Sequence, residues 1–203
     1  MQAPREPRLS GPASDGDRAG RVGGCVLVLS GPSGVGKSTV CARLVATGRY
    51  VWSVSATTRA PRPGEVEGKN YFFLDRATFE RWIAEGQFLE WARVHGETLY
   101  GTPRRFVAEQ LATGRHVLLD IDVQGAAQLR VADLPLVTVF LLPPSLEVLR
   151  ARLEGRRDTP PAEVERRMAR AQAEIAEAPR FDLQLVNDDL DAVVRAIEAR
   201  VGG

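Results

Sequence analysis

"GPSGVGKSTV", residues 31–40, is the stretch of this 203-residue chain that decides its fold. It matches the pattern Gly-x-x-x-x-Gly-Lys-Ser at every fixed position, after an apolar run and before the helix-like segment KSTVCARLVATG. Glycines let successive backbone N–H groups converge on an anion, and the following helix directs its positive end to the same point. The motif in this context predicts a phosphate-binding loop for a nucleoside triphosphate.

The side chains of this loop have distinct expected roles. Lys37 is one of two lysines in a chain whose other basic charges are arginines. A compact ammonium on a flexible stem suits the β- and γ-phosphates better than a planar guanidinium, so Lys37 is a predicted catalytic residue. We expect the Ser38 hydroxyl to be a Mg²⁺ ligand. The predicted nucleotide-binding residues of the loop are Gly31, Pro32, Ser33, Gly34, Val35, Gly36, Lys37, Ser38 and Thr39.

Composition limits the other classes of partner. A formal net charge of +1 gives no overall attraction to nucleic acid or to an anionic membrane. No apolar run approaches the ~20 residues that span a bilayer. We therefore expect neither nucleic acid nor a membrane as a partner. Cys25 and Cys41 lie in apolar stretches without CxxC spacing, which favours buried thiols in a reducing cytoplasm.

The order of segments predicts the fold class. Residues 1–21, rich in Pro, Gly, Ser, Asp and Arg, are expected to be a disordered extension. Strand-like runs then alternate with helix-like ones, which predicts an α/β fold with a parallel central sheet and helices on both faces. The expected strands are 21–30, 51–59, 116–122, 136–144 and 181–188, and the expected helices are 37–48, 101–114, 145–155, 160–178 and 190–201. Between residues 61 and 101, short aromatic-rich pieces at 71–74 and 88–94 and a helix-like piece at 75–86 indicate an α+β insertion on the larger sheet.

Two further groups of residues indicate ligand chemistry. Arg59 and Arg62 flank a proline and Tyr71 follows, so two guanidiniums could hold a second phosphate dianion. On this pattern alone a solvated basic turn is equally consistent. The phosphate loop favours a phosphate site, because an enzyme that transfers a phosphoryl group needs a site for the acceptor. Asp120 and Asp122 end an apolar strand, where ligands gather in open α/β sheets, and a solvated strand end is the alternative.

The blocks GPSGVGKST, SVSATTRAPRPGEVEGKNYFF, FLEWARVHG, YGTP, LLDIDVQG and VNDDL occur in this order. From Gly24 to its end the chain therefore resembles guanylate kinase, the enzyme that phosphorylates GMP with ATP. The resemblance implies a P-loop three-layer fold in residues 22–203. Its core would be 22–54, 103–150 and 180–203, with an α+β GMP-binding insertion at about 55–102 and a small helical lid at about 151–179.

The resemblance also implies roles for individual residues. Arg59, Arg62 and Tyr71 would hold the GMP phosphate, with a further contact from Tyr100, while Ser55, Glu90 and Thr102 would contact the guanine or its surroundings. Guanine offers N1–H and an exocyclic amine as donors, both of which a carboxylate reads, whereas adenine has an acceptor at N1. Asp120 and Asp122 would act near the guanine amine or the metal-bridged phosphates, and Asn187 would lie beside the adenine of ATP.

The implied lid supplies arginines to the transferring phosphates. Arg152, Arg156 and Arg167 stand at the matching places and, with Arg59, are predicted catalytic residues. Arg157 stands where a glycine is more usual, so it is an alternative to Arg156. A charged, solvent-facing helix with Glu–Arg pairs explains most of these residues equally well.

The expected reaction is ATP + GMP ⇌ ADP + GDP, with Mg²⁺ and without a covalent intermediate. One alternative is a related kinase with another acceptor, such as a ribose bisphosphate. Another is a guanylate-kinase-like interaction domain that has lost catalysis, against which the intact phosphate loop argues. The sequence leaves the oligomeric state open, with a homo-oligomer as one outcome.

Overall fold

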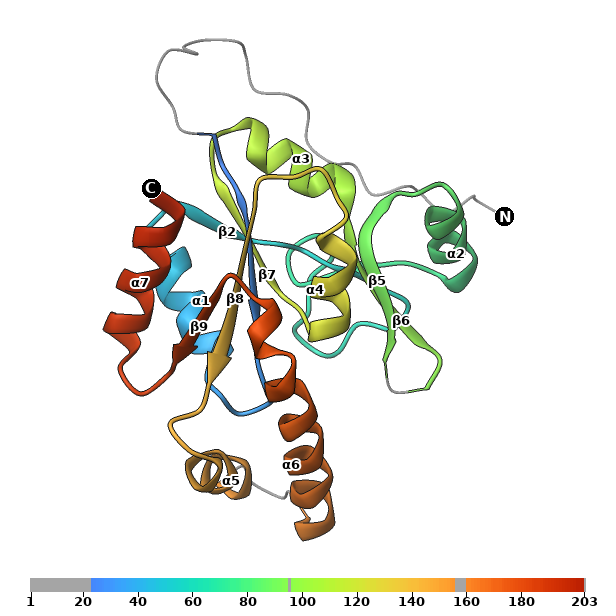
Figure 1. The fold of residues 1–203 in the computed structure, drawn as a ribbon. Helices are drawn as coiled ribbons and strands as arrows, with labels where there is room; N and C mark the ends of the chain where they lie inside the picture. Colours follow the sequence, from blue (N-terminus) through green and yellow to red (C-terminus); the bar gives the residue numbers. More distant parts are fainter. Residues whose placement is uncertain (1–22, 95, 156–159, 203) are drawn as a thin grey trace.

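The computed structural model describes residues 23–94, 96–155 and 160–202. The predicted extension at 1–21 and the predicted lid residue Arg156, with its alternative Arg157, lie outside the described residues. A five-stranded parallel sheet with the order β2-β7-β1-β8-β9 forms the centre (Figure 1). Its strands are β1 (Val26–Ser30), β2 (Tyr50–Trp52), β7 (His116–Asp120), β8 (Leu136–Leu142) and β9 (Leu183–Val186).

Helices cover both faces of this sheet. Helices α1 (Lys37–Val45) and α7 (Leu190–Gly202) lie on one face, and α3 (Arg104–Ala112) and α4 (Val123–Leu129) lie on the other (Figure 1). Within β1, Leu27 and Leu29 belong to the core layer that contains α1 and α7, whereas Val26 and Val28 belong to the opposite layer. Alternate side chains of a strand point to opposite faces, so β1 is buried from both sides. The predicted α/β fold with a parallel central sheet is confirmed.

A second, smaller sheet with the order β4-β3-β6-β5 lies beside the first. Its strands are β3 (Ala56–Thr57), β4 (Phe72–Phe73), β5 (Phe88–Val94) and β6 (Thr98–Pro103), and helix α2 (Arg76–Ala84) packs on it. The rings of Phe79 and Phe88 stack with their centroids 4.4 Å apart. This sheet therefore has a core of its own, and its strand β5 packs against α4 of the larger layer (Figure 1).

Two helices extend from the carboxyl edge of the central sheet. Helix α5 (Leu146–Glu154) begins at Ser145, whose Oγ accepts a hydrogen bond from the Val148 N–H, and α6 (Pro161–Ala176) begins with a proline, which suits a first helical position. The helices share the apolar residues Leu149, Leu153, Val164, Met168 and Ala171. The short 3₁₀ turn η1 (Ala178–Arg180) follows α6. No helix in the described ranges has the length and apolar character needed to cross a membrane.

Some expected boundaries are wrong. The single strand expected at 51–59 is two strands, β2 in the central sheet and β3 in the second sheet, because the chain crosses between the sheets at residues 53–55. The helix expected at 101–114 starts only at Arg104, because residues 101–103 complete β6, a strand that was not expected. Helix α4 was not expected either, and it begins where the Asp122 side chain accepts from two backbone N–H groups.

Candidate active site

The loop between β1 and α1 has the shape that its glycines predict. Gly31, Gly34 and Gly36 have φ angles of 141°, 88° and 106°. A Cβ on Gly31 would lie 2.5 Å from the Leu141 carbonyl oxygen, and a Cβ on Gly36 would lie 2.5 Å from Asn187 Nδ2. Both the backbone angle and the close neighbours therefore require glycine at these two positions.

Lys37 begins α1 and extends back over the loop. Its Nζ donates to the Gly31 carbonyl oxygen at 2.6 Å and lies 4.0 Å from Asp120 Oδ1. Asp120 ends β7, the strand beside β1, so the carboxyl ends of two parallel strands bring these side chains together. Burial raises the pKa of the Asp120 carboxyl, and the charge of Lys37 opposes that rise. Ser38, on the first turn of α1, is exposed.

The far side of the loop is held through one carbonyl oxygen. Asn187, which follows β9, donates from Nδ2 to the Val35 oxygen at 2.7 Å, and Arg152 of α5 donates to the same oxygen at 3.1 Å. The other terminal nitrogen of Arg152 lies 3.4 Å from the Asn187 carbonyl oxygen, to which it donates. Arg152 therefore contacts the backbone that supports the loop.

An open cleft of about 1080 Å³ lies between the phosphate loop, the end of β7 and helix α6. The predicted residues that line it include Lys37, Asp120, Asp122 and Arg167. Arg167 donates from Nε to Glu163 Oε1 at 2.7 Å. The cleft thus combines a lysine and α6 arginines with carboxylates, an arrangement suited to a polyphosphate and a cation.

Arg170 is a residue of this cleft that sequence reasoning missed. It donates from Nε to Glu174 Oε1 at 2.7 Å, and its Nη2 lies 3.5 Å from Asp122 Oδ2. Asp122 itself caps α4 by accepting from the backbone N–H groups of Gln124 and Gly125. The signal was present, because Arg170 is three residues after Arg167 and so shares its helix face.

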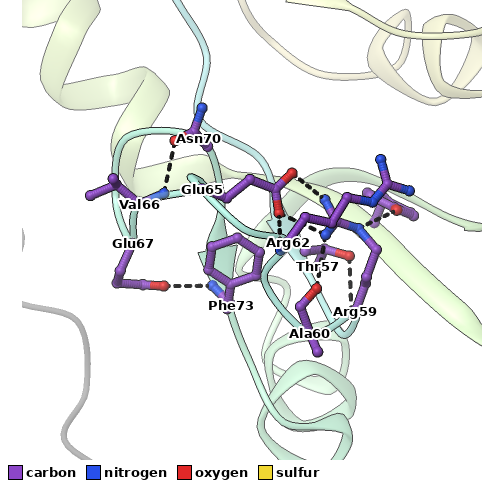
Figure 2. Close-up of polar contacts among 10 residues, drawn as sticks. Thr57, Arg59, Ala60, Arg62, Glu65, Val66, Glu67, Asn70 and Phe73 are labelled. Carbon is purple, nitrogen blue, oxygen red and sulfur yellow. Dashed lines mark hydrogen bonds and ion pairs between the residues drawn. The ribbon is translucent and has the colours of Figure 1, made fainter.

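The predicted acceptor clamp lies in the second sheet and in the turn after β3, and Figure 2 labels its two arginines, Arg59 and Arg62. Arg59 pairs with Glu65 at 2.7 Å and donates from Nε to the Tyr100 hydroxyl at 3.2 Å. Its guanidinium carbon is 5.1 Å from the centroid of the Tyr71 ring. Arg62 is exposed, and among the described residues its guanidinium has no hydrogen-bonding partner. The structure therefore groups Arg59, Tyr71 and Tyr100.

Glu90 and Thr102 face each other on β5 and β6. The Thr102 hydroxyl donates to Glu90 Oε1 at 2.6 Å, and the exposed fractions of the two residues are 0% and 6%. Burial raises the pKa of the Glu90 carboxyl, the hydrogen bond from Thr102 lowers it, and the charge of Asp122 raises it. A Cβ on Gly125 would lie 3.1 Å from Glu90 Oε2, so this oxygen faces the start of α4. Ser55 directly precedes β3 and its carbonyl accepts from the Phe72 N–H.

Comparisons with known proteins agree with this architecture. A family profile described as guanylate kinase matches residues 24–201. A guanylate kinase of Gloeobacter violaceus is 54% identical over 187 residues, which cover 91% of this chain and 90% of the relative. One from Streptomyces kasugaensis is 51% identical and covers 86% of this chain and 85% of its own length. The crystal structure of guanylate kinase from Anaplasma phagocytophilum superposes with a TM-score of 0.68 at 36% identity, covering 89% of this chain and 85% of the other. This chain belongs to the guanylate kinase family.

Proposed function

We propose that this chain transfers the γ-phosphoryl group of ATP to GMP, giving ADP and GDP. The observation that carries the proposal is a complete phosphate loop, with Lys37 over the Gly31 carbonyl, in a chain that also holds the buried carboxylate of Glu90. The loop supplies a site for the phosphates of the donor nucleotide. The carboxylate can recognise guanine by accepting hydrogen bonds from the base. A kinase with a different acceptor would have no use for Glu90 and Thr102 in this arrangement.

The donor side would hold ATP through the backbone N–H groups of residues 31–39 and the Lys37 ammonium. Asn187 borders the loop, in keeping with a place beside the adenine. The α6 arginines, Arg167 among them, would reduce the charge on the transferring phosphoryl oxygens. Arg152 would support the loop from behind, and Arg156 keeps its predicted catalytic role as a proposal.

The acceptor side would hold the GMP phosphate between Arg59, Arg62, Tyr71 and Tyr100. Arg62 is the arginine that we expect to contact the phosphate most directly, because it is exposed and its guanidinium makes no hydrogen bond among the described residues, although its charge also acts on Glu65. The two oxygens of the Glu90 carboxylate would accept from the guanine N1–H and amine, one from each donor, with Thr102, Ser55 and Asp122 nearby.

The donor set suits Mg²⁺, which prefers oxygen ligands and keeps several waters. Ser38 is an exposed hydroxyl at the start of α1, and Asp120 is a carboxylate beside Lys37. No group of three or more His, Cys, Asp and Glu side chains in the described part of the chain could hold a metal ion unaided. We therefore propose that Ser38 holds Mg²⁺ together with the nucleotide phosphates, where the ion would neutralise charge between the β- and γ-positions.

The transfer needs no covalent intermediate. An oxygen of the GMP phosphate forms a bond to the γ-phosphorus while the bond from that phosphorus to the β,γ-bridging oxygen breaks, and ADP leaves with this oxygen. The phosphate is itself a competent nucleophile, so the protein contributes position and charge. Closing of α5 and α6 with the second sheet over both nucleotides would exclude water and suppress hydrolysis of ATP.

The division into a core, an insertion at about 55–102 and a lid at about 151–179 is part of this proposal, since closure requires parts that move separately. A cytoplasmic location is also proposed, on the two free, buried cysteines Cys25 and Cys41.

A coupled assay of ADP release tests the reaction. Purified protein with ATP and Mg²⁺ is given GMP, AMP, UMP, CMP and ribose phosphates as acceptors in separate reactions. GMP is expected to give the highest kcat/KM, by about 100-fold or more over AMP, because an unpaired buried carboxylate rejects the adenine N1 acceptor. An equal or higher value with another acceptor would refute GMP as the substrate.

A further inference from the structure

Glu65 lies in the turn after β3 and is bound to Arg59 through both carboxylate oxygens. Nη1 of Arg59 donates to Oε2 at 2.7 Å and Nη2 donates to Oε1 at 2.8 Å (Figure 2). The side chains of both residues are largely buried, with exposed fractions of 16% and 18%. Two parallel hydrogen bonds between planar groups fix orientation as well as distance.

The remaining donors of Arg59 are also mostly occupied. A guanidinium has five N–H donors. Besides the two bonds to Glu65, Nε donates to the Tyr100 hydroxyl at 3.2 Å and Nη1 donates to the Ala60 carbonyl oxygen at 2.8 Å. The rings of Tyr71 and Phe73 stand 5.1 and 5.8 Å from the guanidinium carbon. One N–H, on Nη2, is left among the described contacts, so Arg59 can offer a phosphate a single, already aimed donor.

Glu65 is itself held in place. Its Oε2 also accepts from the backbone N–H of Arg62 at 2.7 Å, which ties the carboxylate to the turn that carries the second arginine. The two bonds to Arg59 and this backbone bond lower the pKa of Glu65 to about 2, so the carboxylate stays ionised throughout the neutral range. One side chain thus connects Arg59 with the backbone of Arg62.

We propose that Glu65 is a positioning residue for the acceptor phosphate, acting by holding the Arg59 guanidinium between Tyr71 and Tyr100 with its free N–H turned to the substrate. The inference rests on the proposed function, which places the acceptor phosphate at this clamp. In this arrangement Arg59 and Glu65 largely neutralise each other, so Arg62 provides the net positive charge of the clamp. Arg59 provides one donor in a fixed direction. An Arg59 released from Glu65 would gain charge but lose its fixed direction.

The positioning role and simple charge balance predict opposite changes in acceptor binding when Glu65 is replaced by Gln. If Glu65 only neutralised Arg59, the substitution Glu65→Gln would raise the positive charge of the clamp and strengthen binding of a phosphate dianion. If Glu65 orients Arg59, the same substitution weakens binding, because an amide offers one oxygen where two are used. The direction of the change in KM for the acceptor therefore separates the two explanations.

The experiment compares the wild-type chain, Glu65→Gln and Glu67→Gln. Glu67 is a matched control in the same turn, because its Oε2 accepts from the Phe73 backbone N–H at 2.9 Å and shares no hydrogen bond with Arg59 (Figure 2). We expect Glu65→Gln to raise KM for GMP about tenfold, with kcat and KM for ATP changed by less than about twofold. Glu67→Gln should change all three by less than about twofold. An unchanged or lowered KM for GMP in a Glu65→Gln protein whose melting temperature matches the wild type overturns the proposal.

A double-mutant cycle shows whether Glu65 acts through Arg59. Arg59→Lys removes the planar fork that Glu65 binds, so adding Glu65→Gln to it should change KM for GMP by less than about twofold more. A further tenfold rise would mean that Glu65 acts independently of Arg59 and would also overturn the proposal. If the wild type prefers another monophosphate, the proposed function fails, and the same comparison is made with that acceptor because Glu65 serves the phosphate and not the base.

Discussion

The phosphate loop and the acceptor clamp would both hold a phosphate, but they are built in opposite ways. The loop uses backbone N–H groups, and its shape is fixed by glycines whose neighbours leave no room for a side chain. The clamp uses side chains on a turn beside two-residue strands, and its shape is fixed by the ion pair of Arg59 with Glu65. In the backbone site, substitution of any of a few glycines should disrupt binding. In the side-chain site, several residues each determine part of the geometry, so single substitutions should have smaller and separate effects.

Replacing the lysine tests the loop most severely. Lys37→Arg keeps the charge but cannot place a planar guanidinium over the Gly31 carbonyl. We expect kcat to fall about 100- to 1000-fold, as for loss of one preorganised donor at a transition state. The measurement is ADP release with GMP as acceptor, alongside a thermal melt. Activity within threefold of the wild type would show that charge alone matters and would remove the contrast between the two sites.

Glu90 tests whether base reading is separate from phosphate holding. Glu90→Gln should raise KM for GMP about 30-fold and leave KM for ATP unchanged, because a carboxamide cannot accept from both guanine donors. Measuring kcat/KM for both nucleotides over a concentration matrix gives the two effects separately. An unchanged KM for GMP would exclude Glu90 as the base reader.

The same variant has a consequence for stability. The pKa of Glu90 is higher in the folded chain than in the unfolded chain, so the folded state binds more protons between these two values and loses stability as pH rises through them. At pH 7 the uncharged Gln should therefore give a higher melting temperature than Glu, and the gain should shrink as the pH falls to about 4.5. Calorimetry at pH 4.5 and pH 7 checks the sign.

Substitutions at two glycines near opposite ends of α1 distinguish a change in loop shape from the cost of backbone strain. Gly36 and Gly48 both have positive φ, 106° and 78°, but a Cβ would meet Asn187 only at Gly36 and has open space at Gly48. Either Gly→Ala change should cost about 1–2 kcal/mol of stability from the left-handed conformation. Only Gly36→Ala should also raise KM for ATP, by about tenfold. Equal ATP kinetics in the two variants would show that the loop tolerates reshaping.

The smallest effect is expected at Arg170. Arg170→Gln removes the contact between α6 and Asp122 and should lower kcat by about two- to fivefold, because exposed ion pairs contribute at most about 1 kcal/mol. Arg105→Gln is the control, since Arg105 makes a similar i,i+4 pair with Glu109 on α3. A loss above 20-fold would indicate that Arg170 contacts the transferring phosphates directly.

The two sites also differ in how far the sequence predicts them. The strand, loop and helix around Lys37 follow from a local pattern with fixed spacing, and the structure confirms their arrangement. The geometry of the clamp could not be predicted from a local sequence pattern. Its strands β3 and β4 have two residues each, too few to show a period, and Arg59 meets Tyr100 only through the pairing of β3 with β6. Glu65 could be found only from its contacts, because its sequence surroundings resemble any charged turn. The spacing of Arg170 from Arg167 places both on one helix face, but only the structure shows that this face borders the cleft.

The single carbonyl oxygen of Val35, which accepts from both Asn187 and Arg152, links three segments that are far apart in the sequence. A shift of α5 by about 1 Å would stretch the 3.1 Å hydrogen bond of Arg152 unless its side chain moved in compensation. If a bound triphosphate shifts this carbonyl oxygen, the position of α5 and the occupancy of the loop are thermodynamically coupled. If a bound triphosphate favours one position of α5, then any ligand or cross-link that fixes that position must tighten the triphosphate by the same factor.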